Sequence, residues 1–119
     1  MEKKVVPEYE YLGLGFPITL TNIEFLKIHG QWYPKINVDK VANEAFHALL
    51  EKAAIEFITG KEIEFIRIYL NMTKQAFGKR INVAHTTILR WEKVANKVPK
   101  TRKDHRLAFQ ELKNVTVTI

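Results

Sequence analysis

The stretch TKQAFGKRINVAHTTILRWEK, residues 73–93, has an apolar pattern from which the structure of the C-terminal half can be predicted. Phe77 and Ile81 recur at helical spacing in its first part, and Ile88 and Trp91 do so in its second part. Apolar residues three or four positions apart lie on one face of a helix, so each part has one face to bury. The stretch therefore predicts two short helices that pack through these faces.

Gly78 and Asn82 predict how the two helices are joined. A glycine lets two helices cross closely because no side chain holds them apart, and Asn is the non-glycine residue that best tolerates the left-handed conformation at a helix end. Thr73 is the expected N-cap of the first helix. Two helices joined in this way have the geometry of a helix-turn-helix, which places its second helix in the major groove of DNA.

Four polar residues share the outward side of the second predicted helix: His85, Thr86, Thr87 and Arg90. Arg grips the O6 and N7 atoms of guanine, and Thr offers a hydroxyl and a methyl group suited to thymine. We expect phosphate contacts from Lys74 and Gln75, and Lys93 is placed to add positive charge nearby. Trp91 is interpreted as a core anchor. A merely solvated helix face is the alternative interpretation of the polar residues.

The charge is unevenly distributed between the two halves of the 119-residue chain. Residues 1–58 hold six Lys or Arg and eight Asp or Glu, whereas residues 59–119 hold 13 and five. A basic half favours a polyanion such as nucleic acid, although basic surfaces also merely aid solubility. The chain has no cysteine, which excludes disulfides, thiolate nucleophiles and cysteine-ligated metal sites.

The N-terminal segment MEKKVVPEYEYLG lacks the apolar run of a signal peptide. No later stretch approaches the roughly 20 apolar residues of a membrane span. We therefore expect a cytoplasmic protein without a membrane partner.

The first part of the chain, to about Ile36, has β-like composition on both sides of a His29-Gly30 turn signal. We expect a small antiparallel sheet, with Pro34 at the edge or the end of a strand because proline lacks the ladder donor. Its aromatic residues are interpreted as the core of this sheet rather than as a platform for bases or carbohydrate. They are Tyr9, Tyr11, Phe16, Phe25, Trp32 and Tyr33.

From Asn37 to Phe57 the apolar residues recur at helical spacing, which predicts a linker helix capped by Asn37 or Asp39. Thr59 and Glu62 have the spacing of a capping box and predict that the next helix starts there.

A last amphipathic helix is expected at about residues 103–113, followed by an edge strand in the tail VTVTI, residues 115–119. The expected fold class is α+β. Residues 1–58 form a small antiparallel β region plus a linker helix, and residues 59–119 form an all-α helix-turn-helix domain with its C-terminal helix and short strand.

The stretch from Thr59 to Lys93, TGKEIEFIRIYLNMTKQAFGKRINVAHTTILRWEK, resembles the Cro/C1-type (XRE) helix-turn-helix domain of bacterial regulators. The arrangement of the whole chain is similar to MqsA/HigA-like antitoxins of type II toxin–antitoxin systems. These antitoxins and this chain have in common the patterns "YEY.G", "LTN", "TGKEI..IR" and "RWEK". The matching residues are Tyr9, Tyr11, Leu20, Asn22, Thr59, Gly60, Glu62, Ile63, Arg67, Trp91 and Glu92.

The resemblance implies a sequence-specific DNA-binding antitoxin that represses its own operon and neutralises a partner toxin. The expected partners are a palindromic double-stranded operator, a second copy of the chain in a homodimer, and a small basic toxin protein. The last helix and the VTVTI tail are the leading candidates for the dimer surface. The resemblance further implies a buried structural ion pair between Arg67 and Glu92. No cofactor and no metal are expected.

The chain departs from this family at several positions. Many such antitoxins bind structural zinc through Cys-x-x-Cys pairs, whereas the corresponding stretch here has no cysteine, so packing of Ile28 and Trp32 is expected to replace the metal. Ala84 removes the preferred N-cap of the second helix, a loss of about 1 kcal/mol in typical cases. Asn82 and Val94 stand where the family prefers glycine.

Two other functions are considered. A stand-alone helix-turn-helix transcriptional regulator without a toxin shares every DNA-binding feature. A basic ribonuclease is disfavoured because its acid–base residues would have to come from histidines scattered over different elements. These are His29, His47, His85 and His105. The expected protein is not an enzyme.

Overall fold

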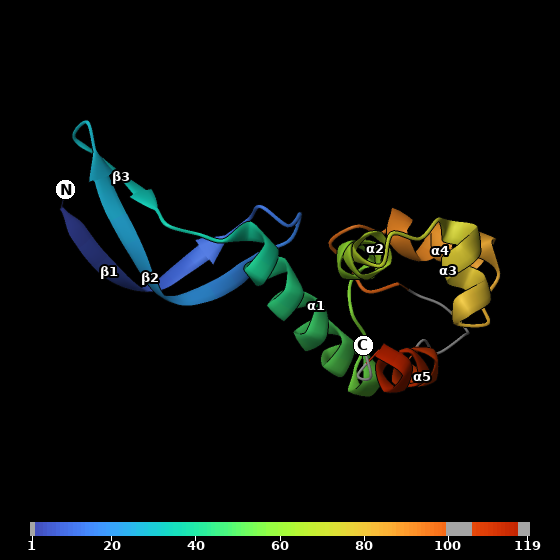
Figure 1. Cartoon of the computed structure of the whole chain (residues 1–119). Coiled ribbons are helices and arrows are strands. Elements are labelled where there is room, and N and C mark those ends of the chain that lie inside the picture. The colour runs from blue at the N-terminus through green and yellow to red at the C-terminus, as the bar shows by residue number, and fades with distance from the viewer. Residues whose placement is uncertain (1, 100–105, 117–119) are drawn as a thin grey trace. The chain divides into compact units, whose positions relative to one another are not determined.

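A computed structural model describes residues 2–99 and 106–116 and has an α+β architecture, as predicted (Figure 1). Three antiparallel strands, in the order β1-β2-β3, precede five helices in this part of the chain. The strands are β1 (Lys3–Tyr11), β2 (Ile18–Ile28) and β3 (Gln31–Pro34). The helices are α1 (Val38–Ile55), α2 (Gly60–Tyr69), α3 (Lys74–Arg80), α4 (His85–Lys93) and α5 (Arg106–Thr116).

The chain forms two compact units, and the second begins at Asn43, inside α1. Most of α1 thus groups with the later helices, whereas the division expected from the sequence places the whole linker helix with the sheet. In the part of the chain that the structure covers, no helix combines the length and the apolar character needed to cross a membrane.

The turn between β2 and β3 consists of His29 and Gly30, as predicted. Both have positive φ, 50° and 81°, which is the combination required by a two-residue type I′ hairpin. β3 is an edge strand and ends at Pro34, so the missing amide of proline costs the sheet little.

The long β1–β2 ladder contains one irregularity, where Pro7 lies opposite Asn22. The pairs on either side, Val6 with Ile23 and Glu8 with Thr21, keep the same register. Asn22 has a φ of 54°, and proline has no N–H to donate, so the ladder is interrupted at this point. The half-buried residues accordingly step by three here, from Val6 to Tyr9, instead of by two. The kink keeps apolar residues of both strand halves on one face, where Tyr9 contacts Phe25 edge-on at 5.3 Å.

The aromatic residues of the sheet are less buried than the sequence suggests. Phe16 is buried, whereas Tyr33 is 48% exposed and the others are half-buried. The ring of Trp32 is covered by the ammonium groups of Lys4 and Lys27, at 4.4 and 5.9 Å from its centroid. This face of the ring is therefore not an open stacking platform.

The expected packing of Ile28 against Trp32 is wrong. The ladder pairs Trp32 with Lys27, so these two share a face, and Ile28, the next residue along the strand, points to the other face. Ile28 is 39% exposed.

The second unit has a well-packed apolar core.

Helix α1 begins after Asn37, whose side chain accepts a hydrogen bond from the amide of Lys40 at 3.1 Å, as the capping prediction requires. The predicted stripe of α1 is only partly buried, because Val38 is 52% exposed, and Phe57, beyond the end of α1, is 41% exposed. The largest fully buried side chains are Trp91, Phe77, Phe109, Leu50, Ile58, Ile63, Ile66 and Ile88.

Helix α5 closes this core with Phe109 and Leu112, which are 0% and 3% exposed. Gln110 donates a hydrogen bond to the carbonyl of Ala54 at 2.9 Å and fastens α5 to the end of α1. The helix continues through residues 115 and 116, where the sequence predicts the start of a strand. The remainder of that strand, residues 117–119, and the expected helix start at residues 103–105 lie outside the described residues.

Candidate nucleic-acid interface

The start of α2 is capped in the predicted way. The Thr59 hydroxyl accepts a hydrogen bond from the Glu62 amide at 3.2 Å, and the Glu62 carboxylate accepts one from the Thr59 amide at 2.9 Å. The next two amides of α2 donate to the segment that follows α4. Gly60 bonds the carbonyl of Lys97 at 3.1 Å and Lys61 that of Ala95 at 2.8 Å. These bonds hold the start of α2 against the end of α4.

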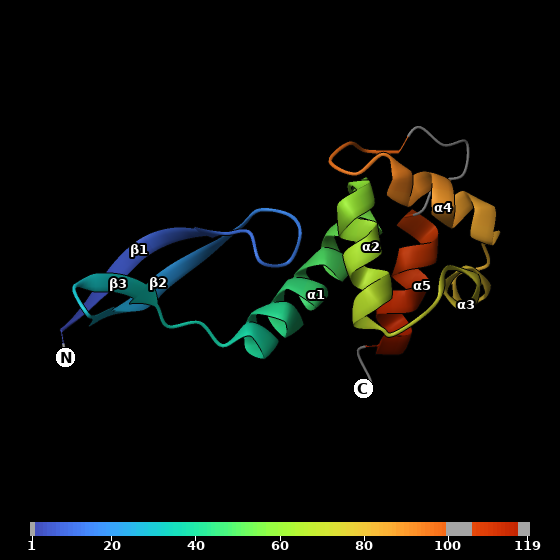
Figure 2. The same cartoon turned by 90° about the horizontal axis from the view of Figure 1, so that it is seen from above.

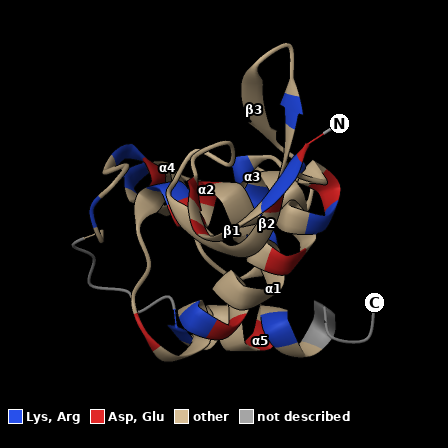
Figure 3. Cartoon of the chain, turned by 90° about the vertical axis from the view of Figure 1, so that its left-hand side faces the viewer, with Lys and Arg blue, Asp and Glu red and all other residues tan. Residues whose placement is uncertain are grey.

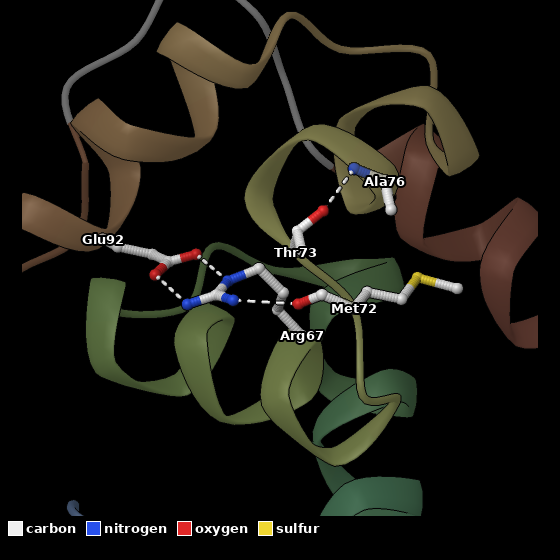
Figure 4. A network of polar contacts seen from close by, with 5 residues as sticks. All are labelled: Arg67, Met72, Thr73, Ala76 and Glu92. Atoms are coloured by element: carbon white, nitrogen blue, oxygen red, sulfur yellow. Dashed lines mark hydrogen bonds and ion pairs between the residues drawn. The ribbon is translucent and has the colours of Figure 1, made fainter.

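A buried ion pair joins the opposite end of α2 to α4 (Figure 4). The Arg67 guanidinium donates to both carboxylate oxygens of Glu92, at 2.7 and 2.9 Å, and its third bond goes to the carbonyl of Met72 at 2.9 Å. The two side chains are 12% and 4% exposed. The hydrogen bonds to Glu92 raise the pKa of Arg67 above its ordinary value. The guanidinium of Arg67 therefore stays protonated at every ordinary pH. The pair implied by the resemblance is present.

Helices α3 and α4 lie side by side at one end of the second unit (Figure 2), and Gly78 of α3 lies against Val83, where the chain turns into α4. A Cβ at this position would overlap the carbonyl oxygen of Val83, whose amide bonds the carbonyl of Gly78 at 2.7 Å. Asn82 has a φ of 58°, the left-handed conformation expected from its identity. Thr73 caps α3 by accepting a hydrogen bond from the Ala76 amide at 3.0 Å.

Helix α4 has one buried side and one exposed side. Ile88, Trp91 and Glu92 face the core, at 0%, 1% and 8% exposure, so Trp91 is the core anchor that its position indicates. The exposed residues include four of the five predicted reading or phosphate-contacting residues of this helix: His85, Thr86, Arg90 and Lys93. The fifth, Thr87, is half-buried and lies at the margin of the exposed side.

Lys and Arg residues occur on both α3 and α4, the two helices that form this end of the unit (blue in Figure 3). Gln75 is exposed and Lys74 half-buried, both in the first turn of α3. Residues 73–93 contain five Lys or Arg and a single acid, Glu92. Because that carboxylate is buried against Arg67, no exposed acid within this stretch offsets the positive charge.

Leu89 belongs to the exposed side of α4 and was missed in the sequence analysis. It is 51% exposed, and it lies three residues after Thr86 and four before Lys93, which places all three on one side of the helix. The sequence indicates the outward orientation of Leu89, because the apolar residues Ile88 and Trp91 already define the buried side of the helix.

The N-terminus of α4 has no side-chain cap. Ala84 adopts the extended N-cap conformation, with φ −62° and ψ 143°, but offers no side-chain acceptor. The Thr87 amide already donates to the carbonyl of Ala84 at 2.9 Å, so the amide that a side-chain cap would engage is that of Thr86. We expect Ala84→Ser to raise the free energy of unfolding by about 1 kcal/mol, because a serine hydroxyl accepts a bond from this amide. Urea unfolding followed by circular dichroism measures the gain. Ala76→Ser, inside α3, is the matched control and should lose a few tenths of a kcal/mol, roughly the helix-propensity difference. Equal changes in the two variants would contradict the expectation that a serine at position 84 stabilises α4 as its N-cap.

The end of α4 carries an unusual backbone conformation. Val94 has an ordinary helical φ of −78°, and the left-handed residue is Ala95, with a φ of 52°. An alanine pays roughly 1–2 kcal/mol for this conformation. The amide and carbonyl of Ala95 bond Glu92 and Lys61, at 3.2 and 2.8 Å, which holds the strained residue in place.

The histidines in the described part of the chain lie on separate elements, at the β2–β3 turn, on α1 and at the start of α4. Within the described residues, no three His, Asp or Glu side chains gather as a metal-ligand set. Comparisons of this chain with protein families, with curated proteins and with solved structures gave no match.

Proposed function

We propose that this protein binds duplex DNA sequence-specifically, with α4 as the helix that enters the major groove. The observation that carries the proposal is the orientation of α4. Its Ile88, Trp91 and Glu92 side is fixed to the core, while its opposite side is exposed, polar and basic. Such a helix, preceded at a tight turn by a second short helix, has the form used to read base edges.

The exposed side chains divide by chemistry into two roles. Arg90 presents a bidentate donor suited to guanine. His85 and Thr86 lie in the first turn of α4, the end of the helix that enters the groove. Lys74, Gln75 and Lys93 flank this side and contact backbone phosphates, which fix the orientation of the helix without reading sequence. Thr87 lies between the core and the groove.

Arg90→Ala tests the base-reading role. We expect it to weaken binding to the preferred duplex by about 1–3 kcal/mol and to relax the preference at one base pair, because one bidentate contact is lost. Lys74→Ala should weaken binding to all sequences alike and flatten the dependence of affinity on salt. Fluorescence anisotropy with the selected duplex and a scrambled duplex, at several salt concentrations, separates the two effects. Equal losses of Arg90→Ala on both duplexes would contradict base reading.

The natural target of such a protein is an inverted repeat bound by a homodimer, because helix-turn-helix proteins usually read half-sites about one helical turn apart. We propose that the chain is a cytoplasmic repressor of its own operon. A gel shift with the DNA upstream of its own gene tests this, and failure to prefer that DNA over a scrambled duplex would contradict it.

The resemblance to antitoxins adds a partner toxin to the proposal. Residues 1–58 are the expected toxin-binding part, and the sheet residues within this range are half-buried or exposed rather than enclosed in a core. Purification from native cells distinguishes the two candidates. A small basic protein in stoichiometric amount supports the antitoxin, and its absence supports the stand-alone regulator.

A further inference from the structure

Leu89 is an apolar side chain on the exposed side of α4. Successive residues of a helix are rotated by about 100°, so the core-facing direction set by Ile88, Trp91 and Glu92 has Thr86 almost directly opposite. By the same rotation, Leu89 lies nearer to that outward direction than the half-buried Thr87 does. Leu89 is 51% exposed, although every other residue nearby on this side is polar or charged.

The surroundings of Leu89 favour one kind of partner. Arg90 and Lys93 adjoin it on the same helix, so a surface that covers Leu89 must also accept two positive charges. The major groove of DNA meets both conditions, because its edges carry acceptors and phosphates for the cations and a methyl group on each thymine. Leucine cannot hydrogen-bond, and the thymine C5-methyl is the one apolar group that the four bases present there.

We propose that Leu89 reads a thymine by packing against its C5-methyl group, in the same half-site as the guanine bound by Arg90. This rests on the proposed DNA-binding function and adds a second, apolar element to its specificity. Cytosine has hydrogen at C5, so the contact favours a T·A pair over a C·G pair at this position without any hydrogen bond.

The test removes the methyl group from the DNA and the leucine from the protein. The probe is the tightest duplex that the full-length protein selects from a randomised library, with each thymine replaced in turn by deoxyuridine, which lacks only the methyl. One replacement should weaken binding of the unaltered protein about three- to fivefold, the effect of losing one buried methyl. Leu89→Ala should bind the thymine duplex more weakly by at least as much, and should be indifferent to that same replacement.

Leu12→Ala is the matched control, because Leu12 is also a strongly exposed leucine, 63% exposed, but lies between β1 and β2, outside both α4 and α5. It should keep the full deoxyuridine profile of the unaltered protein. Circular dichroism and size-exclusion chromatography verify that both variants keep their fold and oligomeric state.

The outcomes separate this inference from the proposed function. If Leu89→Ala retains the deoxyuridine profile, or if Leu89→Ala changes only the oligomeric state, thymine reading is overturned while DNA binding stands. If the unaltered protein selects no sequence at all, the proposed DNA-binding function itself is overturned.

Discussion

Glu92→Gln should lower the free energy of unfolding by about 3 kcal/mol, at the lower end of the cost of breaking a buried ion pair by changing one partner. The loss arises because Arg67 keeps its charge but no longer faces a carboxylate. Its side chain is 12% exposed, so water cannot replace the two bonds of 2.7 and 2.9 Å. Glutamine has nearly the same shape as glutamate, so packing is preserved and the change isolates the charge. Urea unfolding followed by the fluorescence of the two tryptophans measures it.

Two further variants make this prediction specific. Glu51→Gln removes a carboxylate that is 72% exposed and 4.0 Å from Lys113, and it should change stability by less than about 0.5 kcal/mol. The double variant Arg67→Met with Glu92→Leu removes both charges and should recover most of the loss, because buried pairs add little net stability over apolar packing. If Glu92→Gln costs no more than Glu51→Gln, the pair does not lock α2 to α4.

The features that the sequence predicts well are those with a local cause. The caps at Thr59 and Thr73 and the left-handed Asn82 each depend on neighbours within about four residues, and the structure has all three. The His29-Gly30 turn is of the same kind. The α+β fold class follows from these signals together with the change from strand-like to helical spacing near Asn37.

The features that the sequence does not predict depend on contacts distant along the chain. Ala95 adopts a left-handed conformation because its carbonyl is held by Lys61 of α2, and nothing near residue 95 indicates this bond. The interruption of the β1–β2 ladder at Pro7 requires knowing that Asn22 lies opposite. Leu89 is different, because helical geometry alone gives its orientation.

Gly78→Ala should lower the free energy of unfolding by about 2 kcal/mol, and the sign of this change is informative. In an uncrowded helix, alanine is more favourable than glycine by about 1 kcal/mol, so the same substitution would stabilise the protein. Here the added Cβ overlaps the carbonyl oxygen of Val83, which is a backbone atom, while the amide nitrogen of His85, at 3.4 Å from the Cβ, is in ordinary contact. Overpacking against backbone is costly because no rotamer change relieves it.

The reciprocal control lies on the same helix. Ala76→Gly, at an exposed position of α3, should cost about 1 kcal/mol through propensity alone. Unlike Ala76→Gly, Gly78→Ala should also change the position of α4, because the added Cβ pushes α3 away from Val83, in the segment that leads into α4. At a temperature where both variants are folded, Gly78→Ala should therefore bind the selected duplex at least tenfold more weakly, whereas Ala76→Gly should bind it normally. A stabilised Gly78→Ala variant with unchanged affinity would mean that the α3–α4 crossing is loose and that the orientation of α4 does not depend on it.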